Sequence, residues 1–331
     1  MSIVSYRRNA NIDFLRLVAA FLIVFLHVGW TGEHAYDFSN IVRSAARWCV
    51  PFFFLIIGYF STDKSEIVCF SEKTTLRIFN IFVVASAIYF PMHFFQHGRH
   101  LELELLIKGT WFHLWFLGAS FFSLFLFRAI RAVNFSFVLP YLSILILALF
   151  FVAEVYFEQT GVSSADAPRV LFRHLSAISF IWIGAWLKLN FEIVKRFAYV
   201  ILIIGVLLFI AEIYFFGRFN LEYARYQMMP SIVPVCVGLI LVSELVSYRL
   251  PAKLGFVSFN LALPIYIFHP LFIEGIRVIE RQWNWDQSRV LLALEAFGLS
   301  FIFSVFIWQL IPKFHNILNG TLSFGRKDQP N

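Results

Sequence analysis

The sequence predicts an all-α integral membrane protein, a polytopic bundle of about ten transmembrane helices. Hydrophobic residues make up 60% of the 331 residues and charged residues only 14%, whereas a soluble domain carries roughly 25% charged residues. The apolar residues form continuous runs rather than an alternating pattern, which favours helices over the strands of a barrel. Most runs approach the roughly 20 residues that a helix needs to cross a bilayer.

Ten apolar runs are candidates for spans. In chain order they are Ile12–Trp30, Trp48–Ser61, Ile78–Phe95, Phe112–Phe127, Phe137–Phe157, Leu171–Leu189, Phe197–Phe216, Ile232–Val246, Phe256–Ile276 and Val290–Ile311. The second, fourth and eighth runs are short, so the number of spans is predicted to within one or two. The first run contains Arg16 and lacks a small-residue cleavage site, so we interpret it as a retained span and not a signal peptide. Pro51, Pro264 and Pro270 are expected to kink or end helical segments.

Loop charges predict the orientation. An even number of spans places both termini on one side, and Lys and Arg are in modest excess on that side, as in Arg7, Arg8 and Lys64. The positive-inside rule therefore places both termini in the cytoplasm. No linker or repeat divides the chain, so residues 1–331 are expected to form one membrane-embedded domain, with 312–331 as a cytoplasmic tail.

The net charge and the cysteines do not indicate a nucleic-acid-binding, zinc-binding or disulfide-bonded protein. The formal net charge of +7 is explained by basic cytoplasmic loops, so nucleic acid is not an expected partner. Cys49, Cys69 and Cys236 lie far apart and form neither a CxxC pair nor a zinc spacing. They are interpreted as ordinary thiols without disulfides.

The first span carries polar residues that are costly in hydrocarbon. Arg16 and His27 are eleven residues apart, so on a helix they differ by about 20° and share one face, roughly 16 Å apart along the axis. Asp13 precedes Arg16 by three residues and can orient it. Snorkelling explains Arg16 alone, and a core position explains His27 alone. Two such residues on one face favour a functional site.

Two further histidines lie at similar depth in this topology. His113 and Trp115 in "WFHLWFLGA" mark the start of the fourth span, and His269 in "LPIYIFHPLF" lies in the ninth. Three histidines can indicate a metal, but no HxxxH pair or neighbouring carboxylate fixes a ligand geometry. The predicted site therefore contains no metal.

Four motifs in order along the chain resemble the acyltransferase-3 family of membrane O-acyltransferases. "IDFLRLVAAFLIVFLH" resembles its R-x10-H signature, "VPFFFLIIGYF" its VPxFFxxSGYL segment, and "FHLWFL" and "IYIFHPL" its HLWFL and IYxxHP segments. The subgroup that it most resembles comprises enterobacterial common antigen and related surface-polysaccharide O-acetyltransferases. Two features depart from the family: Ile57 replaces its serine, and "SEKTTLRIF" offers only Lys73 and Arg77 where the family often has a denser basic motif.

The resemblance implies an O-acetyltransferase of the bacterial inner membrane. Its donor would be cytosolic acetyl-CoA, and its acceptor a sugar hydroxyl of O-antigen, capsule or common antigen, or of a lipid-linked oligosaccharide precursor. Membrane lipid surrounds such a protein. The resemblance does not specify the acceptor.

Roles for single residues follow from the resemblance together with the first-span geometry. Arg16 would pair with a phosphate of CoA, oriented by Asp13, and His27 would be the general base. An acetyl-histidine relay stays open. The other cofactor-binding candidates are Arg47, Lys73 and Arg77, which ordinary interfacial or positive-inside charge also explains. The substrate-binding candidates are His113, Trp115, Tyr266 and His269. For the two aromatics, packing or an interfacial belt is an equal explanation.

A transporter or flippase for a lipid-linked sugar or small solute is the alternative. It too would have about ten spans with polar residues near the midplane. The absence of a two-fold internal repeat and the asymmetry of the motifs favour the enzyme. Gly58 is expected to let two helices approach closely.

Overall fold

The computed structural model describes residues 9–29, 38–62, 72–97, 105–130, 138–162, 167–218, 226–246, 250–285 and 287–320. These residues are helical or connect helices, with no strand among them. The helices are α1 (Ala10–His27), α2 (Phe38–Ala45), α3 (Cys49–Ser61), α4 (Glu72–His97), α5 (Leu105–Lys108), α6 (Trp115–Ile130), α7 (Leu139–Thr160), α8 (Ala167–Leu189), α9 (Phe191–Val194), η1 (Lys195–Phe197), α10 (Ala198–Arg218), α11 (Ile232–Leu245), α12 (Ala252–Trp283), α13 (Arg289–Leu310) and α14 (Pro312–Leu318).

The predicted helical membrane fold is confirmed. Within the described ranges, eight segments are long and apolar enough to cross a membrane, and two shorter apolar helices lie at Trp115–Phe127 and Ile232–Leu245. Each predicted span corresponds to one of these ten segments. The chain is therefore a multi-pass helical membrane protein.

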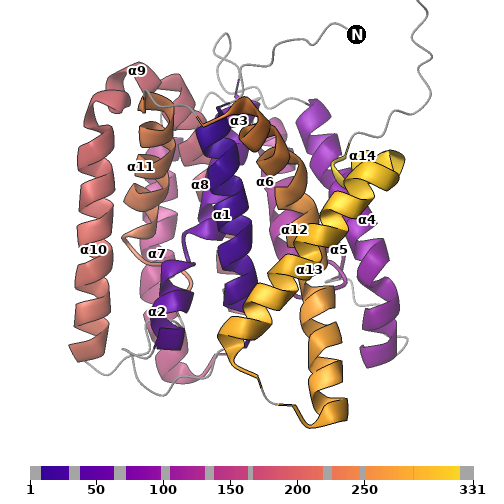
Figure 1. The fold of residues 1–331 in the computed structure, drawn as a ribbon. Coiled ribbons are helices and arrows are strands. Elements are labelled where there is room, and N and C mark those ends of the chain that lie inside the picture. Colours follow the sequence, from indigo (N-terminus) through magenta and orange to yellow (C-terminus); the bar gives the residue numbers. More distant parts are fainter. Residues whose placement is uncertain are drawn as a thin grey trace, which may run out of the picture.

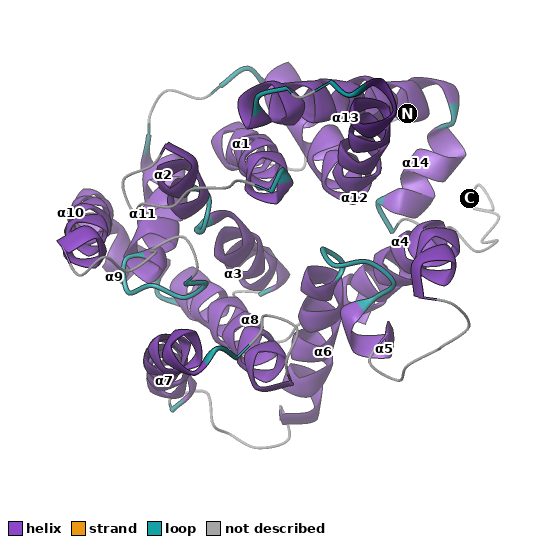
Figure 2. Cartoon of the chain, turned by 90° about the horizontal axis from the view of Figure 1, so that it is seen from below, coloured by secondary structure: helices purple, strands orange, loops and turns teal. Residues whose placement is uncertain are grey.

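The helices run alternately up and down (Figure 1). Helices α1, α3, α6 and α12 lie around the middle of the bundle, whereas α7, α10 and α13 lie at the edge (Figure 2). Burial follows this arrangement, because 61% of the apolar window of α12 is buried but only 11% of that of α10. The helices that border the middle also carry most of the predicted site residues.

Helices α3 and α8 cross at two facing glycines. A Cβ atom added at Gly58 would lie 1.8 Å from the Ile181 carbonyl oxygen, and one at Gly184 would lie 2.0 Å from that of Leu55. Only glycine permits this backbone approach. The predicted close helix approach at Gly58 is confirmed, and its partner is α8.

Two local predictions need correction. The fourth span was expected to include Phe112, but α6 begins at Trp115 and His113 lies in the preceding turn. Pro264 and Pro270 were expected to kink or end a helix, and neither ends one, because both lie inside the continuous 32-residue α12. Side chains satisfy two of the carbonyl groups near these prolines, as the site geometry below shows.

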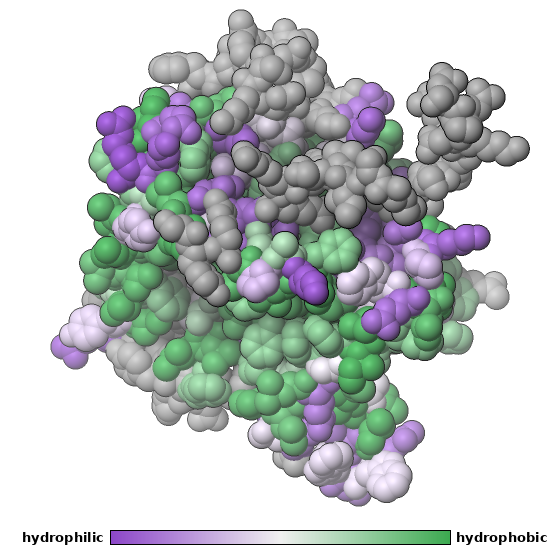
Figure 3. All heavy atoms as spheres, turned by 45° about the horizontal axis from the view of Figure 1, so that its top comes forward, coloured by the Kyte–Doolittle hydropathy of each residue, from purple (hydrophilic) through white to green (hydrophobic). Residues whose placement is uncertain are grey.

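The surface separates polar ends from an apolar flank. Polar side chains gather toward the end that carries α9 and α14, whereas the flank below is mostly apolar (Figure 3). Part of the predicted tail packs on the bundle: α14 precedes Asn319, whose carbonyl accepts a hydrogen bond from Arg77 Nε at 2.6 Å. Residues 321–331 of that tail, and the orientation markers Arg7, Arg8 and Lys64, lie outside the described residues.

Candidate active site

Two helices far apart in sequence hold the main candidate residues. Helices α1 and α12 contact each other extensively. Near one end, the Arg16 guanidinium carbon lies 5.7 Å from the centre of the Phe259 ring. At the other, His27 Nδ1 lies 2.8 Å from His269 Nε2. Because both helices run from the upper toward the lower end (Figure 1), the pairs lie at two different depths.

The three predicted histidines come together at the lower pair. The His27 and His269 rings are nearly parallel, with centres 5.1 Å apart, and the His113 ring stands edge-on to His269 at 5.4 Å. His113 and His269 are buried, with exposed fractions of 1% and 0%. His27 is only partly buried. Among the described residues, no group of three or more His, Cys, Asp or Glu side chains is arranged to hold a metal ion.

Pro270 helps to set the hydrogen bonds of this cluster. Proline has no N–H, so the carbonyl four residues earlier, that of Tyr266, loses its helical donor. His269 Nδ1 lies 2.8 Å from this oxygen. A carbonyl only accepts, so His269 Nδ1 must carry the proton, and in the neutral ring Nε2 is then an acceptor. Side-chain donation thus replaces the missing backbone bond.

The same reasoning extends to His27. If His269 Nε2 accepts, His27 Nδ1 must donate across the 2.8 Å contact. With both rings neutral, His27 Nε2 keeps its lone pair. Nε2 is not among the buried unpaired atoms, and no hydrogen bond to it exists within the described residues. The arrangement therefore presents one basic nitrogen from a partly exposed ring.

Tyr266 and His113 pack beside the histidine pair. The Tyr266 hydroxyl donates to the main-chain oxygen of His113, and the Tyr266 and His113 ring centres are 5.3 Å apart. Neither ring nitrogen of His113 makes a hydrogen bond of ordinary geometry within the described part of the chain. The Tyr266 hydroxyl is thus used inside the protein, and His113 offers unused polar atoms beside His269.

Arg16 lies in an aromatic setting. Its Nη1 donates to Asp13 Oδ1 at 2.8 Å, and its guanidinium carbon lies 5.2 Å from the Phe60 ring centre. Arg77, from α4, lies 6.0 Å from Phe259. The structure thus brings Arg16 and Arg77 to the same Phe259 ring. Lys73 is exposed on the first turn of α4.

The remaining two candidates lie elsewhere. Arg47 is in the turn before α3 and is close enough to His27 for its charge to act on the imidazole. It therefore lies at the His27 end, away from Arg16. Trp115 contacts Phe54 at 5.9 Å and the Arg173 guanidinium at 5.8 Å between centres. Arg173 and Phe259 were not predicted as site residues.

The order of the motifs agrees with a comparison to known families. A family model described as an acyltransferase domain (Acyl_transf_3) matches residues 9–309. The chain belongs to this acyltransferase family. The match covers nearly all of the described bundle and every candidate residue.

The curated relatives of the chain carry other names. A protein named amino-acid racemase from Enterococcus faecalis is 24% identical over 308 residues, which are 83% of this chain and 42% of that protein. Another of the same name and organism is 30% identical over 127 residues, 34% of this chain and 17% of that protein. A serine/alanine racemase from Enterococcus gallinarum is 28% identical over 131 residues, 34% of this chain and 18% of that protein.

The chain spans less than half the length of these curated relatives. No solved structure matches it. The comparisons therefore support membership of the acyltransferase family, and they do not identify the surface-polysaccharide subgroup that the motifs resemble.

Proposed function

We propose that this protein transfers an acetyl group from cytosolic acetyl-CoA to a hydroxyl of a bacterial surface polysaccharide or its lipid-linked precursor. The observation that carries the proposal is the His27–His269 pair, which leaves His27 Nε2 as a basic nitrogen on a partly exposed ring. Family membership supports acyl transfer. The protein would lie in the inner membrane with both termini in the cytoplasm.

The donor would enter from the end that carries Arg16 and Arg77. Guanidinium groups bind phosphate through paired N–H donors, and these two flank one Phe259 ring. Lys73 would add charge at the rim. The pantetheine arm would extend along α1 toward His27, about 16 Å further along the helix axis. Asp13 would hold Arg16 in place.

The acceptor hydroxyl would react beside His27. Its oxygen would attack the thioester carbonyl carbon while its proton moves to His27 Nε2. The carbon–sulfur bond would break, and the imidazolium would return the proton to the departing thiolate, which gives an O-acetyl ester and CoA. His113, whose ring nitrogens make no hydrogen bond of ordinary geometry within the described residues, would contact the thioester oxygen or the sugar. Arg47, close to His27, would bind at this end and not at the CoA phosphates.

The first test is the acetyl ester content of surface glycans, measured by mass spectrometry. Cells would express the protein or its His27→Ala variant at matched membrane levels. We expect added acetyl groups with the protein, and a loss of about 10²- to 10⁴-fold in transfer rate for the variant. Acetylation that persists in the variant would exclude His27 as the base.

Two controls separate the other functions. A transporter or flippase would move substrate without consuming acetyl-CoA, so purified protein should release free CoA only if it is an acyltransferase. Conversion of L-serine and L-alanine to their D-enantiomers would be measured in the same preparation, because the curated relatives are named racemases. Racemisation without CoA release would overturn the proposal.

A further inference from the structure

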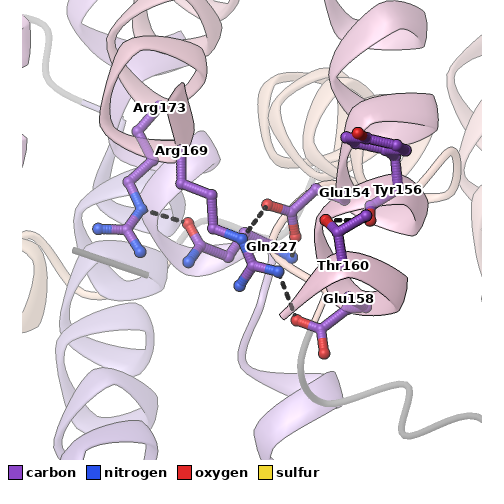
Figure 4. Close-up of polar contacts among 7 residues, drawn as sticks. All are labelled: Glu154, Tyr156, Glu158, Thr160, Arg169, Arg173 and Gln227. Carbon is purple, nitrogen blue, oxygen red and sulfur yellow. Dashed lines mark hydrogen bonds and ion pairs between the residues drawn. The ribbon is translucent and has the colours of Figure 1, made fainter. Parts of the chain in front are cut away.

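A second polar cluster lies beside the candidate active site. This α7–α8 charge cluster comprises Glu154 and Glu158 of α7, Arg169 and Arg173 of α8, and Gln227 of the segment before α11 (Figure 4). Glu154 is fully buried and Arg169 is 5% exposed. Charges buried in a membrane bundle are costly and generally functional. The acetyl transfer outlined above uses none of these five residues.

The cluster is largely paired internally. Arg169 Nη2 donates to Glu158 Oε1 at 2.6 Å, and Arg169 Nε lies 3.9 Å from Glu154 Oε1. The main-chain N–H of Gln227 donates to Glu154 Oε2 at 2.8 Å. These contacts tie α7, α8 and the segment before α11 together, and they fix the position of Gln227.

Arg173 is the member with unused donors. Its Nε donates to Gln227 Oε1 at 2.5 Å, and its two terminal nitrogens donate to no residue in the described ranges. Figure 4 shows its guanidinium turned away from both carboxylates. The charge of Arg47 also reaches Glu154. Glu158 is bound by Arg169 and Glu154 by the main chain of Gln227, so Arg173 keeps its terminal donors for a ligand.

Contacts connect Arg173 to the candidate active site. Its guanidinium carbon lies 5.8 Å from the centre of the Trp115 ring, and Trp115 is two residues from His113, whose ring contacts His269. Arg47 provides a second connection, because its charge acts on both His27 and Glu154. Arg173 and the histidine cluster thus lie toward the same end of the bundle.

We propose that Arg173 and Trp115 form an acceptor subsite for a sugar that carries an anionic group, a carboxylate or a phosphate. The free edge of the guanidinium would bind two oxygens of the anion side by side. The Trp115 ring would pack against the apolar face of the sugar. Gln227 and the internally paired glutamates hold Arg173 in place, so little side-chain entropy is lost on binding.

The assignment of this ligand as the acceptor rests on the proposed function, but its binding can be measured separately. The probes are glucose, glucuronate and glucose 6-phosphate, which differ only at carbon 6. Each would be titrated by equilibrium dialysis against the full-length protein in phosphatidylcholine nanodiscs. We expect glucuronate or glucose 6-phosphate to bind at least about tenfold more tightly than glucose, as a charge-assisted pair predicts.

The test variants separate charge from geometry. Arg173→Gln should abolish the preference for the anionic sugars, and Arg173→Lys should retain only part of it, because it keeps the charge without the paired donors. Arg281→Gln, an exposed arginine of α12 toward the same end, is the matched control and should bind as the original protein does. A thermal melt of each variant checks folding. If Arg173→Gln does not fold, Arg173→Lys decides the test.

Several outcomes would overturn the inference. The first is equal binding of all three sugars. The second is an unchanged preference for the anionic sugars in the folded Arg173 variants. The third is a loss of that preference in Arg281→Gln as well. Loss of anionic-sugar binding in phosphatidylglycerol nanodiscs would show that the subsite takes a lipid headgroup instead. The inference and the proposed function can fail separately. His27→Ala should keep the sugar preference and lose transfer, whereas Arg173→Gln should keep acetyl-CoA binding.

Discussion

At the scale of single residues, His269 determines which nitrogen of His27 is basic. Replacing it with alanine removes the acceptor for His27 Nδ1–H, so the ring is free to adopt the wrong tautomer. We expect kcat to fall between about 10- and 10⁴-fold, the upper figure being the cost of a wrong histidine tautomer in a serine-protease triad. The KM for acetyl-CoA should change little, because Arg16 is on another turn of α1.

A conservative variant provides the control for His269. In His269→Gln, a side-chain oxygen can accept from His27 at a similar reach, so much of the activity should return. Steady-state kinetics of the two variants, at equal amounts of folded protein, measure the difference. Equal losses in His269→Ala and His269→Gln would show that His269 contributes packing and not hydrogen-bond direction.

Pro270 acts on the same hydrogen bonds through the backbone. In Pro270→Ala, a new N–H would compete with His269 Nδ1 for the Tyr266 carbonyl. We expect a lower kcat, together with equal or higher thermal stability. Pro264→Ala is the matched control, because the carbonyl of Asn260, four residues before Pro264, is 3.0 Å from His315 Nε2, outside the histidine cluster. Comparable kinetic losses in both variants would contradict this role for Pro270.

At the scale of helices, the α3–α8 crossing should tolerate no added atom. Gly58→Ala or Gly184→Ala would place a Cβ about 2 Å from a carbonyl oxygen of the facing helix, so the two helices would have to separate. We expect a destabilisation of about 1–3 kcal/mol, typical of overpacking, seen as a lower melting temperature in detergent. Gly298→Ala is the control, because no atom lies within 4 Å of the added Cβ. An unchanged melting temperature for Gly58→Ala would contradict the close crossing.

The sequence was informative about helices but not about their partners. Long apolar runs predicted the ten spans, and the glycine in "LIIGYF" predicted a close approach. That α8 is the facing helix depends on tertiary packing, which a local pattern does not encode. The continuity of α12 was missed for a related reason. Proline removes a backbone donor, so the carbonyl four residues earlier needs another hydrogen-bond donor. In α12 this donor is a histidine side chain, and the structure was needed to identify it.

In the candidate site, too, features within one helix could be predicted and contacts between helices could not. Arg16 and His27 could be placed on one face because both belong to a single helix. The partnership of His27 with His269 joins residues 242 positions apart, which requires α1 and α12 to be neighbours. Arg169 and Arg173 were not predicted as site residues. Their spacing of four, after Glu154 and Glu158 with the same spacing, was a signal of paired helix faces that was overlooked.

At the scale of the whole molecule, the proposed orientation is testable with single-cysteine variants. Cysteine at Arg281, exposed near the end of α12, should react with a membrane-impermeant maleimide added outside intact inner-membrane spheroplasts. Cysteine at Lys313, exposed on α14, should react only after the membrane is opened. Both would be introduced after replacing the three native cysteines. Labelling in the reverse order would overturn the cytoplasmic placement of the termini.

The separation of Arg16 from His27 along α1 has an electrical consequence. If the phosphates of CoA stay beside Arg16 and Arg77 while only the acetyl group reaches His27, no net charge crosses the membrane in a turnover. The rate of acetyl transfer should then not change when a potassium diffusion potential is imposed. A flippase that carries a charged sugar would instead gain or lose about 2.3 kcal/mol per charge for each 100 mV. Acetylation that tracks voltage in sealed vesicles would mean that the donor phosphates, or another charge, move through the bundle.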